Sequence, residues 1–133
     1  MLETAVNRYK QVLVQTSSPG QILIALYDGI FRFLNGAKAC IAKKELSRAR
    51  ELLSKSQAIV QELEIALDHE AFPDLCKNLQ GVYQFCIDRI QSARIKADPA
   101  MIDDVMRVLT PLREAWPVAV AELQKQGAAS RHR

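Results

Sequence analysis

The chain has 133 residues, of which 49% are apolar and 25% are charged, and its formal net charge at pH 7 is +3. This composition is typical of a soluble globular domain and excludes a disordered chain, and the balanced charge argues against a nucleic-acid-binding surface. Five Gly and five Pro are too few for the many tight turns of all-β sandwiches and barrels. We therefore expect one helical domain that does not bind nucleic acid.

Neither a membrane span nor a secretory leader is visible in the sequence. No apolar run reaches the roughly 18 residues that a transmembrane helix needs. The first residues, Met1 to Thr4, lack the basic segment followed by an apolar one that marks a secretory signal. We expect a cytoplasmic protein without membrane insertion.

The N-terminal part of the chain divides into an arm and a first helix. Residues 1–17 show no sustained periodicity and are interpreted as a loosely structured arm. Ser18, Pro19 and Gln21 then form a capping-box pattern with proline at the first helical position, which predicts the start of a helix. Apolar residues at alternating three- and four-residue spacing continue this helix over 19–43.

Three further helices are predicted over 46–67, 74–96 and 99–116, each from one apolar stripe. Asp98 and Pro99 repeat the signal for a helix start before the last of them. Pro111 should kink that helix, and Pro117 should end it or begin a short fifth helix that reaches 126. Residues 127–133 are interpreted as a frayed basic tail.

The predicted fold class is all-α. Short connections join four long amphipathic helices, which favours an antiparallel up-down-up-down four-helix bundle. This bundle domain spans residues 18–126, between the arm and the tail.

The residue types that carry catalysis or bind metals are nearly absent. His69 and His132 are the two histidines, and neither follows a glutamate by three residues, as a di-iron bundle requires. Cys40, Cys76 and Cys86 stand at apolar helical positions without a CxxC spacing, so we interpret them as buried thiols in a reducing compartment. We expect no enzyme activity, no cofactor and no metal.

The first helix has more apolar surface than a bundle seam needs. At about 100° per residue, Ile24 and Phe31 lie on one side of the seam and Ile22 and Phe33 on the other, so the apolar arc spans roughly 200°. Two interpretations stay open: the helix is central and covered, or one flank is an exposed groove for an apolar partner. Two glycines inside this helix, seven residues apart, indicate close approach of a neighbouring helix or of a ligand chain.

Several short elements of the arm and the helices occur in a characteristic order. Tyr9 and Val12 in the arm precede the helix start Thr16-Ser17-Ser18-Pro19 and the element Leu26-Tyr27-Asp28-Gly29. Later elements follow in order: Glu62-Leu63, Leu67-Asp68, Asn78-Leu79, Tyr83, Asp98, Ile102, Val105, Leu109, Leu112-Arg113 and Trp116. Over residues 9–116 this order resembles the flagellin-specific export chaperones, the FliS family. The chain departs from that family at residues 70–74, where the family usually has a Gly-rich turn.

The resemblance implies a cytoplasmic, non-catalytic chaperone with a four-helix bundle. Such proteins bind the disordered C-terminal region of flagellin in apolar surface grooves, prevent its premature polymerisation and deliver it to the export gate of the flagellar type III apparatus. A helical adapter or regulatory module for a non-flagellin partner is the alternative.

The resemblance also implies which residues contact the partner. They are Tyr9, Val12, Tyr27, Asp28, Gly29, Asn78 and Tyr83. The first two would belong to an arm that covers the groove until the client displaces it. Core packing is the other interpretation for the two helical tyrosines, which lie on apolar seams, and a solvated carboxylate is the other interpretation for Asp28.

Overall fold

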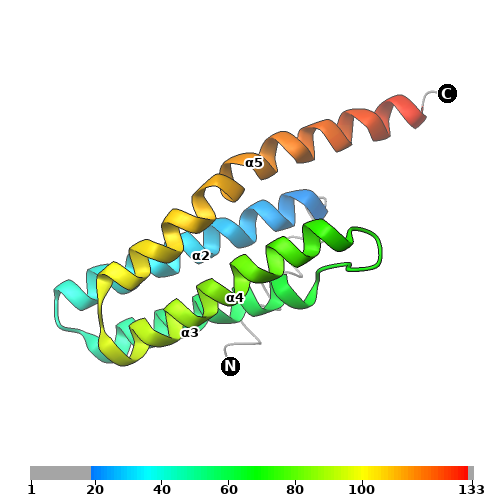
Figure 1. Ribbon diagram of the computed structural model, residues 1–133. Helices are drawn as coiled ribbons and strands as arrows, with labels where there is room; N and C mark the ends of the chain where they lie inside the picture. Colours follow the sequence, from blue (N-terminus) through cyan, green and yellow to red (C-terminus); the bar gives the residue numbers. More distant parts are fainter. Residues whose placement is uncertain (1–18, 132–133) are drawn as a thin grey trace.

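The computed structural model describes residues 19–131, which form four long helices (Figure 1). They are α2 (Pro19–Ala42), α3 (Leu46–Ile65), α4 (Pro73–Lys96) and α5 (Pro99–Arg131). The helices predicted over 19–43, 46–67 and 74–96 are therefore confirmed, with small differences at their ends. The predicted arm and the capping residue Ser18 lie outside the described residues.

Each helix packs against two neighbours at the corners of a square. α2 contacts α3 and α5, and α4 contacts the same two helices. Short connections reverse the chain direction each time, so the predicted antiparallel four-helix bundle is confirmed (Figure 1). All four helices contribute to the core, whose largest fully buried side chains include Tyr27, Tyr83, Ile30, Leu34, Leu53, Ile90, Ile102 and Leu109.

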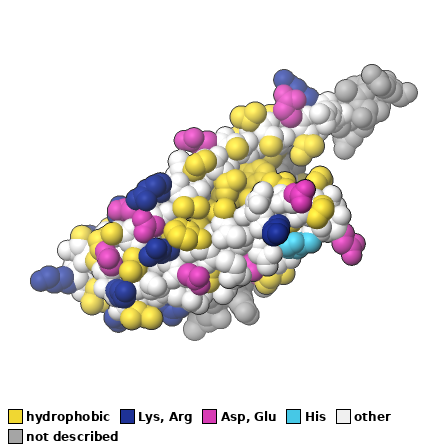
Figure 2. Space-filling view, viewed as in Figure 1, with side chains coloured by type: hydrophobic (Ala, Val, Ile, Leu, Met, Phe, Trp, Pro, Cys, Tyr) yellow, Lys and Arg dark blue, Asp and Glu magenta, His cyan; other side chains and the backbone are white. Residues whose placement is uncertain are grey.

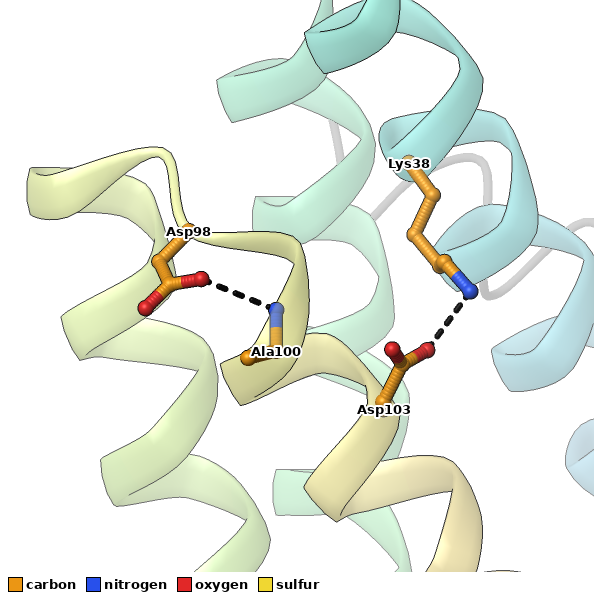
Figure 3. A network of polar contacts seen from close by, with 4 residues as sticks. All are labelled: Lys38, Asp98, Ala100 and Asp103. Atoms are coloured by element: carbon orange, nitrogen blue, oxygen red, sulfur yellow. Dashed lines mark hydrogen bonds and ion pairs between the residues drawn. The ribbon is translucent and has the colours of Figure 1, made fainter.

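One end of the bundle, which we call the closed end, holds the α2–α3 connection (43–45) and the α4–α5 connection (97–98). Ala97 ends α4 in the left-handed conformation, with φ of 52°. Asp98 Oδ1 accepts a hydrogen bond of 2.9 Å from the backbone N–H of Ala100, which confirms the predicted cap of α5. Lys38 Nζ donates to Asp103 Oδ1 at 2.6 Å and joins α2 to α5 there (Figure 3).

α5 is longer than the sequence predicts. It runs without interruption through Pro111 and Pro117 to Arg131, so the expected end or new helix at Pro117 is wrong, and residues 127–131 are helical. An interior proline costs about 3 kcal/mol relative to alanine, and the packing of α5 on α2 beyond Pro111, described below, offsets this cost. The second half of α5 extends past the other three helices (Figure 1).

Candidate functional site

Tyr27 and Tyr83, both expected at the site, lie in the core instead. Their side chains are 0% and 2% exposed, and their hydroxyls share a hydrogen bond of 2.6 Å between α2 and α4. Burial raises the pKa of each phenol above its ordinary value. Trp116 of α5 lies edge-on to Tyr27, with 6.3 Å between ring centroids. The core-packing interpretation therefore holds for both tyrosines, and neither presents a surface to a ligand.

Asp28 and Gly29 serve contacts between helices. The half-exposed Asp28 carboxylate accepts a hydrogen bond from Arg113 Nε and ties α2 to α5. Gly29 is buried, and a Cβ there would lie 3.4 Å from Ile59 Cδ1 of α3. The close approach that the helical glycines indicate is therefore to a neighbouring helix.

The flank of α2 does not provide the exposed groove that its wide apolar arc suggests. Ile22, Phe31 and Phe33 are half-buried and pack against the core. Lys55 Nζ of α3 also lies 5.8 Å from the centre of the Phe33 ring. None of the large exposed apolar residues among 19–126 belongs to α2, and Ile24 is half-buried. The described residues therefore support the interpretation of a central, covered helix.

Two polar contacts identify the sides of α4. Arg89 Nε lies 3.9 Å from Asp104 Oδ2 of α5, and Gln84 Nε2 donates to Glu64 Oε1 of α3 at 2.5 Å. Positions that precede Arg89 by multiples of seven share its side of a helix, because seven residues make nearly two turns. Val82 and Leu75 stand seven and fourteen residues before Arg89, and Asn78 stands eleven residues, or about three turns, before it. All three therefore lie on the side of α4 on which Arg89 meets α5.

α5 follows α2 as far as Val120, but its second half diverges from α4 (Figure 1). Trp116 contacts Tyr27, and a Cβ at Gly20 would lie 2.7 Å from Val120 Cγ1, so the backbones of α2 and α5 come close there. The second half of α5 turns away from the first half of α4 (Figure 1). As a result, no helix within residues 19–131 covers Leu75, which is 51% exposed, whereas Val82 is half-buried against the core.

The opening between these helices is apolar, and we call it the α4–α5 groove. Leu75, Asn78 and Val82 of α4 line one side, and the half-buried Leu112 and Trp116 of α5 line the other. Figure 2 shows hydrophobic side chains gathered between α5 and α4 in this half of the molecule. Exposed apolar residues continue around this end of the bundle: Ile65, Phe72, Val118 and Leu123, each at least 62% exposed.

Asn78 is the one residue of the expected set that the structure places, exposed, beside the groove. Tyr9 and Val12 lie outside the described residues. The sequence contains a signal for Leu75 and Val82, because they stand fourteen and seven residues before Arg89, respectively. In the sequence, Leu75 and Val82 look like part of an ordinary apolar seam. Only the path of α5 shows that they line a groove.

The described chain offers no reactive constellation. No group of three or more His, Cys, Asp or Glu among the described residues could hold a metal ion. No helix among them is long and apolar enough to cross a membrane. The three cysteines are free and buried, as predicted, and burial raises the pKa of Cys86 to about 12. This thiol is therefore protonated and unreactive at neutral pH.

Known proteins are similar in sequence to this chain over most of its length. The family model described as flagellar protein FliS matches residues 2–123. The flagellar secretion chaperone FliS of Bacillus subtilis (strain 168) is 30% identical over 124 residues, which cover 93% of this chain and 92% of that protein. FliS of Vibrio cholerae serotype O1 is 30% identical over 129 residues, covering 94% and 95%.

A solved structure shares the fold as well. The crystal structure of a flagellar chaperone from bacteria superposes with a TM-score of 0.73 at 26% sequence identity, covering 90% of this chain and 98% of that one. Similarity of sequence and of fold thus extends over the whole bundle. The chain belongs to the FliS family, a family of flagellar export chaperones rather than of enzymes.

Proposed function

We propose that this export chaperone binds the disordered C-terminal region of flagellin in the α4–α5 groove. It holds the client back from premature polymerisation and delivers it, in the cytoplasm, to the export gate of the flagellar type III apparatus. The observation that carries the proposal is the apolar surface at this end of the bundle, where Leu75 is 51% exposed and the half-buried Val82, Leu112 and Trp116 lie at the edge of the core. Large exposed apolar patches on a folded domain are typical of interaction sites.

The groove suits a client that folds as it binds. Leu75, Asn78 and Val82 repeat at helical spacing, as expected for a surface that receives an amphipathic helix. A disordered segment loses conformational entropy when it becomes ordered, and burial of its apolar side chains must offset this loss. The apolar residues around this end of the bundle extend the area available to such a segment.

The expected site residues then have different roles. Asn78 offers an amide at the groove that can hydrogen-bond the client. The groove takes its shape from contacts below its surface. The hydrogen bond between Tyr27 and Tyr83 holds α2 against α4, and the one between Arg113 and Asp28 holds α2 against α5. Gly29 acts only through its packing on α3. The role of Tyr9 and Val12 as a covering arm stays a prediction.

The proposal is tested by calorimetric titration with a peptide of the flagellin C-terminal region. We expect saturable binding that Leu75→Ser weakens roughly tenfold or more, since burial of a leucine contributes about 1.5–3 kcal/mol. Ile95→Ser is the matched control, because Ile95 is 79% exposed and lies near the closed end. Equal weakening by both variants would place the client elsewhere.

Absence of binding by the folded protein would remove flagellin as the client. The alternative, an adapter for a non-flagellin partner, would then stand. Deletion of residues 1–17 tests the arm separately: if the arm covers the groove, its loss raises both client affinity and the binding of an apolar dye.

A further inference from the structure

A second surface feature lies near the opposite end of the bundle from the α4–α5 groove. It is a pocket of about 370 Å³ between α3 and α4, lined by Arg50, Gln91, Arg94 and Ile95. Arg50 belongs to the first half of α3 and Arg94 to the last turn of α4. The pocket is therefore close to the closed end, whereas the groove uses the first half of α4.

The two arginines of the pocket have no acidic partner within residues 19–131. Arg50 Nε donates to the backbone oxygen of Arg94 at 3.0 Å, and neither guanidinium has a carboxylate within 4.0 Å in the described part of the chain. Arg94 Nε is buried without an acceptor. Other arginines of the bundle do pair with carboxylates: Arg48, Arg89, Arg107 and Arg113.

The surroundings of the pocket define what would bind there. Residues 43–51 and 94–98 carry six basic and three acidic side chains, so the local field favours an anionic group. Guanidinium groups bind carboxylates through geometrically defined, charge-assisted hydrogen bonds. Ile95 adds an apolar wall that is 79% exposed. A carboxylate next to an aliphatic side chain matches this combination better than a nucleic-acid backbone, which presents no aliphatic group.

We propose that the pocket docks an acidic and aliphatic peptide segment of a second protein. An Asp or Glu of that segment binds Arg50 and Arg94, and a neighbouring Leu, Ile or Val packs on Ile95. Because the pocket and the groove lie toward opposite ends of the bundle, the second protein and the client bind at the same time. This inference does not depend on which client occupies the groove.

The test is an NMR titration of the ¹⁵N-labelled full chain with a short synthetic peptide whose core reads Asp-Leu-Glu-Leu. We expect the shifts to centre on the amide signals of Arg50, Gln91, Arg94 and Ile95. One control peptide replaces both acids by their amides, and another replaces both leucines by glycine. Each control should bind roughly tenfold more weakly or not at all, because each lacks one half of the recognition.

Protein variants make the test specific to the pocket. Arg94→Gln and Ile95→Ser should each weaken binding roughly tenfold. Arg48→Gln removes the same charge from an exposed neighbour outside the pocket and should change affinity less than twofold at physiological salt. Circular dichroism verifies that each variant is folded. Leu75→Ser, which weakens client binding, should leave peptide binding unchanged.

Four outcomes would overturn the proposal. Equal weakening by Arg48→Gln would show unspecific attraction to the basic end of the bundle. Shifts centred on the α4–α5 groove, or no shifts at millimolar peptide, would remove the pocket as a docking site. Displacement of the peptide by the flagellin segment would assign the pocket to the client instead of to a second protein.

Discussion

At the scale of single residues, Tyr27 and Tyr83 form the most consequential contact of the bundle. Their hydroxyls meet at 2.6 Å inside the core and join helices at diagonal corners of the square. A buried hydroxyl that loses its partner retains the cost of its desolvation. The pair therefore restricts which arrangements of α2 and α4 are stable, and thereby the shape of the groove beside them.

Single substitutions should reveal this pairing. We expect Tyr27→Phe or Tyr83→Phe to lower the free energy of unfolding by about 1–3 kcal/mol, because each leaves the other hydroxyl buried without its partner. The double variant should lose less than the sum, since the second change removes an orphaned group. Chemical denaturation of the four proteins measures this coupling. Strict additivity would contradict it.

The sequence predicts where these residues lie on their helices but not what they touch. Tyr27 and Tyr83 stand on apolar seams, which is compatible with burial and with a binding role alike. Asp28 stands on a polar strip, and its partner Arg113 is 85 residues away. Which side chain meets which across the bundle depends on helix rotation and axial register, which no local pattern contains.

At the scale of elements, α5 shows how packing outweighs a local rule. Proline at 117 predicts a helix end because it lacks an N–H donor and crowds the preceding turn. The helix continues because Trp116 packs on Tyr27 and Val120 lies against Gly20, both of α2. The start of α5 follows the sequence closely, since its Asp98 cap acts within one turn.

Two glycine substitutions test the packing of α2 and α4. An added Cβ at Gly81 meets no atom within 4 Å, so Gly81→Ala should stabilise the bundle by about 0.5–1 kcal/mol through helix propensity alone. Gly20→Ala should destabilise it instead, because the Cβ would lie 2.7 Å from Val120 Cγ1. Thermal denaturation distinguishes the two. Stabilisation by both would mean that α5 does not press on α2.

At the scale of the whole molecule, the groove exists because α5 stays in contact with α2 over a longer distance than with α4. α2 and α5 stay together as far as Val120, whereas α4 and α5 meet near the closed end and then separate (Figure 1). The sequence predicts the bundle and, through the order of its motifs, the family. It does not predict the groove, because Leu75 and Val82 look like part of an ordinary apolar seam. Only the structure shows that α5 diverges from this part of α4.

The buried weak acids should make the stability of the whole fold depend on alkaline pH. Burial raises the pKa of Cys86 to about 12, from the ordinary 9.0, and raises the pKa of both core tyrosines. Above pH 9 the unfolded chain releases protons that the folded chain retains, so the free energy of unfolding falls as the pH rises toward 12. Denaturation at a series of pH values measures this slope.

A variant assigns part of this pH dependence to the thiol. Cys86→Ala lowers stability at neutral pH by removing a buried side chain, but its stability should decline less steeply between pH 9 and 12. An identical slope in the variant would show that Cys86 does not contribute to the alkaline loss.

The position of Trp116 has a practical consequence. The chain contains one tryptophan, and its half-buried ring lines the groove with its centroid 6.3 Å from that of Tyr27. Indole emission depends on contact with water, so a guest that covers this ring would shift the fluorescence of the entire protein toward shorter wavelengths. Trp116 is thus an intrinsic fluorescence probe for binding and release of the guest, and no attached label is needed.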